Sequence, residues 1–355
     1  MRPFEMWEPS EVAQAVALLD SAHLAPGSRA PRLLAGGQDL LGELKDDLAR
    51  PAALINLKGI AGLDEIEEVA SGGQSPHALR IGSLVTLARI ADNATLQERY
   101  PLLCAAAVSV GSPQIRSQAT LGGNLCQRPR CIYYRNAAAL CLKKGGRECF
   151  AEGGVNRHNA ILGGGPSWIV HPSDLAPALV ALDASVELTS PTGTRELSLA
   201  DFFTLPADGD VLRENRLGPQ EMITSLTLPA GGGMTGAMTE KATGGRSGDV
   251  RQVYMKFRER ESFDFALVSV SMRVRVVDDR IRAARLVLGG VAPIPWRCLG
   301  AERLLADKPL EPQSFAAAAQ VALAAAEPLE QNAYKVPLAT TLIMRAGAAL
   351  TAETR

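Results

Sequence analysis

The chain has 355 residues, and its 37 Lys and Arg against 38 Asp and Glu leave a formal net charge of −1. This balance lacks the basic excess that binds nucleic acid through its phosphates, so no nucleic-acid partner is expected. No run approaches the roughly 18 apolar residues that a membrane span needs, and the length favours two or three domains.

Residues 1–57 are predicted to form a small α/β unit. Ser10 is a plausible N-cap for a helix over 12–23. A short apolar strand, a Gly-Gly turn (35–39) and a helix start follow, and residues 51–60 form a second buried strand. Two consecutive glycines let backbone N–H groups approach an anion, although the same pattern is common in plain tight turns.

Residues 58–228 are predicted to form a larger α+β segment. Its first half alternates strands and helices: a strand over 63–70, a strand leading into a helix over 77–92, and a helix over 100–110. A second glycine turn, Thr120-Leu-Gly-Gly-Asn124, comes next. Two such turns, with nearby neutral donors and one arginine, are suited to grip a diphosphate.

The second half of this segment follows a stretch rich in cysteine. A strand over 167–170 is expected, then a helix that starts at Pro-Ser-Asp, then another strand up to Ser190. A closing strand over 218–229 contains Ile223 near its start. Asp174 has a simple alternative role as an acid in the first turn of the helix.

Residues 229–249 are rich in glycine and read as a linker between domains. The remaining residues, 250–355, are predicted to form a C-terminal α+β domain. Three alternating strands indicate an antiparallel sheet. Two helical stretches, over 314–329 and 337–353, could cover one face of it.

Four of the six cysteines, Cys126, Cys131, Cys141 and Cys149, stand in a C-x4-C-x9-C-x7-C arrangement. Zinc modules usually take close C-x2–4-C pairs, whereas wider spacing suits an iron–sulfur cluster wrapped by a loop. The spacing alone also leaves zinc or uncommitted reduced thiols open. The stretch is polar and basic, so we expect it to order poorly without a metal. His158 is an additional candidate ligand, or a plain structural residue.

Six motifs in this order resemble the FAD-binding subunits of the xanthine dehydrogenase/molybdenum hydroxylase family. They are AGGQDL (35–40), SPQIRSQATLGGN (112–124), HPSD (171–174), PQEMITSLTLP (219–229), KFRERESFDFALVSV (256–270) and LGGVAPIPWR (288–297). The resemblance covers essentially the whole chain. It implies an α+β fold, with a two-part FAD-binding domain of the vanillyl-alcohol oxidase/p-cresol methylhydroxylase type and a C-terminal α+β domain.

The resemblance also implies which residues bind FAD. The two glycine turns would hold the diphosphate, Ser112 and Asp174 would contact the phosphate and ribityl region, and Ile223 would offer a main-chain contact. Lys256 would place a cation near the flavin, where its alternative is a solvent-exposed strand-edge lysine, and Phe265 would lie beside the isoalloxazine ring. The implied set is Leu34, Ala35, Gly36, Gly37, Gln38, Asp39, Leu40, Gly111, Ser112, Ile115, Arg116, Thr120, Gly122, Gly123, Asn124, Asp174, Ile223, Lys256 and Phe265.

One departure from the family pattern is a long insertion, residues 125–165, between the second glycine turn and Asp174. It resembles loops that carry a [4Fe-4S] cluster in two subgroups, the 4-hydroxybenzoyl-CoA reductases and, more closely, bacterial periplasmic-type aldehyde oxidoreductases. This implies Cys131, Cys141 and Cys149 as cluster ligands. The fourth ligand is then Cys126 or a group near His158.

By resemblance, the expected function is that of an electron-transfer flavoprotein subunit. A large molybdenum-cofactor subunit would oxidise an aldehyde or an N-heterocycle, and a small subunit with two [2Fe-2S] clusters would pass the electrons to FAD. Oxygen, a quinone, NAD or ferredoxin would accept them. The chain has no evident signal peptide of its own, so it would be cytoplasmic, or periplasmic if carried by a partner's signal.

Two rival functions remain open at this stage. The first is a self-contained flavin oxidase of the vanillyl-alcohol type, which would need a catalytic base, and the four histidines offer no clear constellation for one. The second is a zinc-stapled scaffold with an empty glycine cradle. A hydroxybenzoyl-CoA reductase-like or N-heterocycle dehydrogenase complex is the alternative within the same family.

Overall fold

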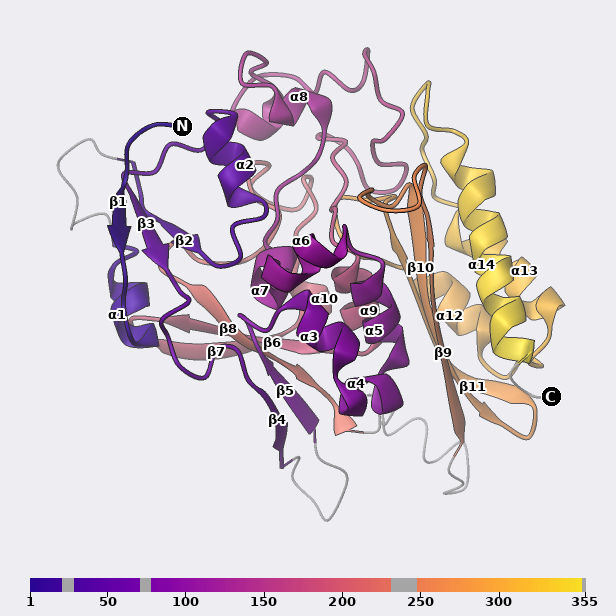
Figure 1. Ribbon diagram of the computed structural model, residues 1–355. Coiled ribbons are helices and arrows are strands. Elements are labelled where there is room, and N and C mark those ends of the chain that lie inside the picture. Colours follow the sequence, from indigo (N-terminus) through magenta and orange to yellow (C-terminus); the bar gives the residue numbers. More distant parts are fainter. Residues whose placement is uncertain (21–28, 71–77, 231–247, 353–355) are drawn as a thin grey trace.

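The computed structural model describes residues 1–20, 29–70, 78–230 and 248–352, and contains three β-sheets in succession along the chain (Figure 1). Helices and mostly antiparallel strands confirm the predicted α+β class. Most of the predicted glycine-rich linker (229–249) lies outside the described residues. No helix in the described ranges is both long and apolar enough to cross a membrane.

The first sheet is parallel and has the strand order β1-β3-β2. Its elements are β1 (Glu5–Trp7), α1 (Val12–Ala17), β2 (Arg32–Leu34), α2 (Leu40–Lys45) and β3 (Ala53–Asn56). The predicted N-cap of α1 is wrong by one residue, because Glu11 takes the extended N-cap conformation. The Ser10 N–H is instead satisfied by the side-chain oxygen of Gln14, at 3.0 Å.

The second sheet is antiparallel and has the order β4-β5-β8-β6-β7. Its strands are β4 (Ile66–Val69), β5 (Ala78–Gly82), β6 (Ser185–Ser190), β7 (Gly193–Ser198) and β8 (Met222–Leu228). Its helices are α3 (Leu87–Asp92), α4 (Ala94–Arg99), α5 (Pro101–Val108), α6 (Pro113–Gln118), α7 (Leu121–Leu125), α9 (Leu175–Ala181) and α10 (Leu199–Phe202). Every residue of α9 is buried, as expected for a helix at the centre of a core.

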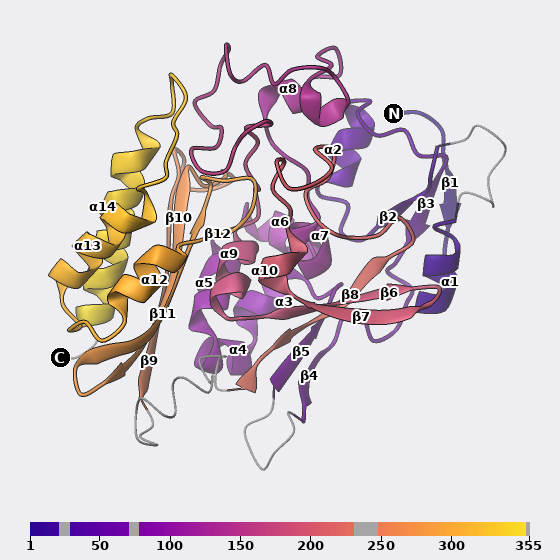
Figure 2. The ribbon, with the colours of Figure 1, turned by 180° about the vertical axis from the view of Figure 1, so that it is seen from behind.

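The third sheet is antiparallel and has the order β12-β11-β10-β9. Its elements are β9 (Asp249–Phe257), β10 (Val268–Val277), β11 (Arg280–Gly289), β12 (Trp296–Arg297), α12 (Leu299–Leu305), α13 (Pro312–Ala322) and α14 (Lys335–Ala352). The helices α12 to α14 cover its outer face, and α5 and α9 contact its inner face (Figures 1 and 2). Strand β10 is therefore buried at all ten positions.

The cysteine-rich insertion connects α7 to α9 and contains α8 (Ile132–Arg135) and the 3₁₀ helix η2 (Leu142–Lys144). In Figure 1 it lies at the top of the molecule, beside α2. The predicted strand over 167–170 is wrong. The backbone there makes isolated hydrogen bonds; for example, the carbonyl oxygen of Trp168 accepts the N–H of Ala160. These bonds form no ladder with a neighbouring strand.

Candidate functional site

The two glycine turns meet in the folded chain. A Cβ placed on Gly36 would lie 2.1 Å from the carbonyl oxygen of Gln118, a distance that no side chain tolerates. Gly37 has a φ of +72°, a conformation that favours glycine. The first turn therefore needs both glycines, one for close approach and one for backbone conformation. This contact places the turn after β2 against the last residue of α6, just before the second glycine turn.

The second turn is held by the side chain of Thr120, which caps α7 by accepting the N–H of Gly123 at 3.3 Å. A Cβ on Gly122 would lie 3.0 Å from the Cβ of Ser83, in the turn that follows β5. The second turn thus lies directly against the five-stranded sheet. The N–H groups of Gly122 and Gly123 donate to the carbonyl oxygen of Ser83 and to the Thr120 hydroxyl.

Both turns line one cleft of about 300 Å³, which continues into a neighbouring cavity of about 240 Å³. The two spaces share Arg32, Leu33, Ala35, Gly123 and Cys126. Thirteen of the residues implied by the family resemblance line the cleft: Ala35, Gly36, Gly37, Gln38, Asp39, Leu40, Gly111, Ile115, Thr120, Gly123, Asn124, Asp174 and Phe265. Gly122 and Ile223 line the neighbouring cavity.

The other four residues expected to bind FAD line neither the cleft nor the neighbouring cavity. Ser112 caps α6 by accepting the N–H of Ile115, and Arg116 donates to the carbonyl of Val110 at 3.0 Å. Leu34 ends β2, and Lys256 supports Asp174. Several residues that line the cleft were not among the implied FAD-binding residues: Arg32, Gln127, Arg130, Phe263 and Asp264. Phe263 and Asp264 lie inside the motif over 256–270, and Arg130 lies between Cys126 and Cys131.

A buried ion pair closes one end of the cleft. The Asp174 carboxylate lies 2.7 Å from Lys256 Nζ and accepts a hydrogen bond of 3.0 Å from the Tyr254 hydroxyl. Burial raises the pKa of Asp174, and the ammonium of Lys256 opposes this rise. Lys256 and Tyr254 lie on β9, so the pair joins the third sheet to the start of α9. Asp174 uses its carboxylate here rather than to cap α9.

His171 lies behind the cleft, 4 % exposed, and contacts the edge of the Phe203 ring. Its Nε2 lies 3.2 Å from the carbonyl oxygen of Leu125, which fits a neutral ring that donates from Nε2. Burial lowers the pKa of His171 from 6.5 to about 4. This side chain therefore stays neutral in the folded protein at ordinary pH.

The buried ring predicts how stability depends on pH. Between pH 6.5 and 4, His171 is protonated in the unfolded chain but stays neutral in the folded chain. The contribution of His171 to the free energy of unfolding is therefore lost as the pH falls through this range. We expect the free energy of unfolding to fall by about 3 kcal/mol more in the native protein than in His171→Gln over this range. Urea unfolding of both proteins at pH 6.5 and pH 4 measures the difference. An equal change in the free energy of unfolding in the two proteins would contradict a neutral, buried His171.

The four cysteines of the insertion lie in two places: Cys131, Cys141 and Cys149 are near one another, and Cys126 lies apart from them. Burial raises the pKa of Cys141 and of Cys149, and the nearby Cys131 thiol raises both slightly further. By contrast, the charged neighbours of Cys126 are Arg32 and Glu214, and burial raises its pKa to about 12. Cys126 lines the cleft next to Gly123. The structure thus places the four predicted metal ligands in two different environments.

Donors surround the three grouped thiols. Backbone N–H groups of Lys143 and Lys144 are directed at Cys141, and those of Trp168 and Ala151 at Cys149. The side-chain N–H of Asn159 lies 3.7 Å from the Cys131 sulfur. His158 lines a further cavity of about 380 Å³ together with Cys131. Among the described residues, no three His, Cys, Asp or Glu side chains are placed to hold a single metal ion.

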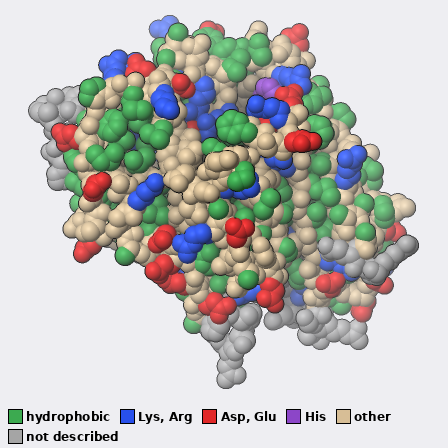
Figure 3. Space-filling model, viewed as in Figure 1, with side chains coloured by type: hydrophobic (Ala, Val, Ile, Leu, Met, Phe, Trp, Pro, Cys, Tyr) green, Lys and Arg blue, Asp and Glu red, His purple; other side chains and the backbone are tan. Residues whose placement is uncertain are grey.

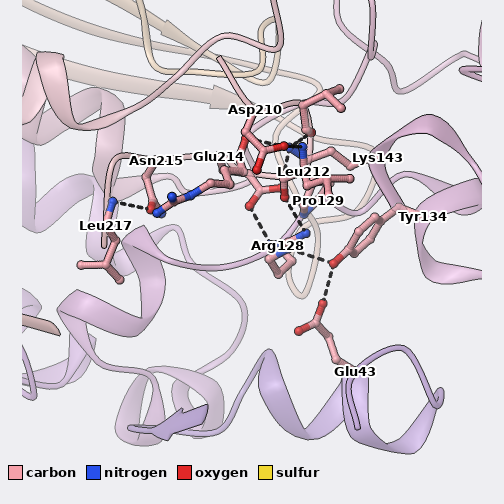
Figure 4. A network of polar contacts seen from close by, with 12 residues as sticks. Glu43, Arg128, Pro129, Tyr134, Lys143, Asp210, Leu212, Glu214, Asn215 and Leu217 are labelled. Atoms are coloured by element: carbon pink, nitrogen blue, oxygen red, sulfur yellow. Dashed lines mark hydrogen bonds and ion pairs between the residues drawn. The ribbon is translucent and has the colours of Figure 1, made fainter. Parts of the chain in front are cut away.

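A buried polar network fastens the start of the insertion (Figure 4). Glu214, 5 % exposed, pairs with Lys143 at 2.9 Å and with Arg128 at 3.2 Å. Arg128 also donates to the Tyr134 hydroxyl, which donates to Glu43 on α2, both at 2.8 Å. Carboxylates from distant segments thus neutralise two cations of the insertion, contacts that the expectation of poor order without a metal did not include.

A second set of contacts fastens the end of the insertion. Lys335, at the start of α14, is 1 % exposed and donates to the carbonyl oxygens of His158, Asn159 and Gly290 at 2.7–3.0 Å. Burial lowers the pKa of Lys335 to about 7. Asn332 donates to the same stretch of backbone. The last helix of the chain thus holds the segment that follows the cysteines.

On the face of the molecule in Figure 3, Lys and Arg side chains gather in the upper half, over the region of α8, and Asp and Glu side chains are more frequent along the lower edge. The insertion therefore lies in the more basic part of this face, in a chain whose formal net charge is −1. A positive local field favours an anionic ligand.

Two family models together match nearly the whole chain. Residues 2–231 match the FAD binding domain in molybdopterin dehydrogenase, and residues 252–350 match the CO dehydrogenase flavoprotein C-terminal domain.

Individual relatives agree with these matches. The chain is 36 % identical over 322 residues to the aldehyde oxidoreductase FAD-binding subunit PaoB of Escherichia coli K12, and the aligned region covers 90 % of each chain. It is 28 % identical to the carbon monoxide dehydrogenase medium chain of Hydrogenophaga pseudoflava, over 97 % of this chain and 95 % of that one. A solved structure of that carbon monoxide dehydrogenase superposes with a TM-score of 0.72 at 25 % identity, covering 99 % of both chains.

Proposed function

The chain belongs to the FAD-binding subunits of the xanthine dehydrogenase and carbon monoxide dehydrogenase family, and from this premise we propose that it is the electron-transferring flavoprotein subunit of a heterotrimeric molybdenum hydroxylase. The observation that carries the proposal is the contact between the two glycine turns at the wall of the cleft. Backbone N–H groups with no side chain in front of them suit a bound diphosphate.

The residues present fit FAD. Gly36 and Gly123 both line the cleft, the close approach of Gly36 to Gln118 leaves no room for a Cβ, and the adjoining cavity near Ile223 offers room for the nucleotide end. At the opposite end, Phe265 is partly exposed and Asp174 is held by Lys256. When bound, FAD would supply the exchange between one-electron and two-electron steps. The chain's own part is to position the flavin and to fix the charge around it.

Similarity to the aldehyde oxidoreductase subunit supports a proposal for the substrate, the partner subunits and the electron acceptor. We propose a large molybdenum-cofactor subunit that oxidises an aldehyde, with an N-heterocycle as the alternative. A small subunit with two [2Fe-2S] clusters would deliver electrons to the FAD. An external acceptor such as oxygen, a quinone, NAD or ferredoxin would take them away.

We further propose that Cys131, Cys141 and Cys149 hold a [4Fe-4S] cluster. The proximity of Cys131 to Cys141 and to Cys149, and the N–H groups directed at their sulfurs, support this, because such donors stabilise thiolate ligands of iron–sulfur clusters. The cluster spreads its ligands over several irons, so it needs no single-ion site. A group near His158 is the fourth-ligand candidate that the geometry favours over Cys126, since His158 and Cys131 line one cavity.

Anaerobic purification followed by assays of flavin, iron and sulfide tests these proposals. We expect one FAD and about four irons per chain, as the cluster's composition requires. Substitution of Cys131, Cys141 or Cys149 by serine should remove the iron, whereas Cys126→Ser should keep it. FAD without iron in the native protein would overturn the cluster, and loss of iron only in Cys126→Ser would reassign the ligands.

The self-contained oxidase is tested by turnover. We expect the isolated chain, loaded with FAD, to give no measurable reduction of its flavin by simple alcohols or aldehydes. Chemical reduction followed by addition of an acceptor should restore the oxidised spectrum. Flavin reduction by the substrate alone would favour the rival function, because the oxidising site would then lie in this chain.

A further inference from the structure

The residue that ends the first glycine turn is held by the cysteine-bearing insertion. Asp39 is the N-cap residue of α2, yet its carboxylate makes no capping hydrogen bond there. It accepts the backbone N–H of Arg128 at 2.6 Å and a guanidinium N–H of Arg135 at 2.7 Å. Arg130 pairs with the same carboxylate oxygen as Arg135, at 3.0 Å. The three donors lie about ninety residues further along the chain.

Burial makes these contacts strong. The Asp39 side chain is 15 % exposed and that of Arg135 is 16 % exposed. Ion pairs that are shielded from water and share hydrogen bonds are worth more than exposed pairs. The insertion therefore fixes the position of Asp39, and through it the end of the Gly36–Gly37 turn.

Arg130 reaches into the cleft itself. Its guanidinium lies over the ring of Phe265, 4.8 Å from the centroid, and donates to the side chain of Gln127 at 3.2 Å. It lines both the cleft and the third cavity, which meet at this point. Its Nε–H is buried, and within the described residues it has no hydrogen-bond partner. A buried donor without an acceptor is costly, and it fits a site that a ligand oxygen completes.

The charges show why two arginines are needed. Asp39 is the only charged residue of the turn from Ala35 to Leu40. Alone, a carboxylate at this position would repel an anionic diphosphate. Arg130 and Arg135 change the local charge from −1 to +1, by simple addition of their two positive charges.

We propose that Arg130 and Arg135 are part of the FAD site, Arg130 as a direct partner of the nucleotide's diphosphate and Arg135 as a positioning residue that acts through Asp39. The inference deepens the proposed function and rests on it. It makes the cysteine-bearing insertion one wall of the nucleotide site, so the chain's affinity for FAD depends on that insertion.

The test uses full-length protein stripped of flavin and titrated with FAD, with quenching of flavin fluorescence as the signal. We expect Arg130→Gln and Arg135→Gln to weaken FAD binding about tenfold or more, the size typical of a lost hydrogen bond to a charged group. Arg147→Gln is the matched control, because Arg147 is an exposed arginine of the same insertion. It should bind FAD within about twofold of the native protein.

Four further measurements distinguish the loss of a charged contact from a general loss of structure. Riboflavin has no phosphate, so its affinity should be the same in all three variants and the native protein. Arg135 also donates to the carbonyl oxygens of Arg128 and Pro129. Because the proposed route to the cleft runs through Asp39, Arg135→Gln should have a smaller effect in an Asp39→Asn background than in the native protein. Arg135→Lys, which keeps the charge, should recover part of the affinity. Urea midpoints of every variant record whether it is folded.

The outcomes are distinguishable. Native-like FAD affinity in folded Arg130→Gln and Arg135→Gln would overturn the inference, as would an equal loss of riboflavin binding or an equal effect of Arg147→Gln. Failure of the native chain to bind FAD would instead overturn the proposed function. Loss of FAD affinity in the two variants alone, with riboflavin binding kept, supports the diphosphate contact.

Discussion

Gly36→Ala is expected to lose FAD almost completely. The new methyl group would stand 2.1 Å from the carbonyl oxygen of Gln118, so the backbone of one turn must move away from the other. Overpacking of this kind costs about 1–3 kcal/mol of folding free energy. A displacement of about 1 Å at a positioned site can lower function about 100-fold, and we expect FAD affinity to fall by that order. Flavin absorbance of the purified variant, with fluorescence titration, measures the loss.

Gly42→Ala is the matched control, because it lies six residues later in α2 and its added Cβ would meet nothing within 4 Å. Alanine is favoured over glycine inside a helix, so this variant should gain about 0.5–1 kcal/mol of stability and keep its flavin. A full flavin content in Gly36→Ala, at native affinity, would show that the contact between the turns is not needed for FAD.

Lys256→Met is expected to be among the most destabilising single substitutions in the chain. Lys256 and Asp174 have side chains about 4–5 % exposed and lie 2.7 Å apart. Removal of the ammonium leaves the carboxylate buried with the Tyr254 hydroxyl as its remaining side-chain donor in the described structure. Breaking a buried pair by removing one partner typically costs about 3–5 kcal/mol. Urea unfolding of the native protein and the variant gives this difference.

Two variants control for the loss of a lysine as such. Lys308→Met removes an exposed lysine from the same part of the chain and should change stability by less than about 0.5 kcal/mol. Asp174→Asn combined with Lys256→Met removes both charges and should be more stable than Lys256→Met alone. If the double variant is no more stable than the single one, the uncompensated carboxylate is not the cause of the loss.

The glycine turns and the three strands of the last sheet could be predicted because their signals are local. A Gly-Gly pair after an apolar strand indicates a turn whatever the rest of the chain does. Alternating residues in β9, β10 and β11 likewise indicate strands, and the sheet forms as expected. Only β12 was not anticipated there, since a strand of two residues has no readable period.

The contacts of the insertion could not be predicted, because they join residues far apart in sequence. Nothing in the local pattern pairs Arg135 with Asp39 or Lys143 with Glu214. The position of Cys126 illustrates the same limit. It directly follows the short helix α7, so its side chain belongs to the cleft, although its spacing groups it with the other cysteines. The spacing of the cysteines gives only their separation along the chain, whereas binding of a metal requires that their side chains point to the same place.

The anchoring of the insertion by Lys335 and Asn332 has a consequence for how the protein is made. Residues 158–160 acquire their final hydrogen bonds only after the chain has been synthesised to its last helix. During translation these two residues leave the ribosome well after the cysteines. The hydrogen bonds beside Cys131 are therefore complete only once α14 has been synthesised, so the proposed [4Fe-4S] cluster would be inserted after that point.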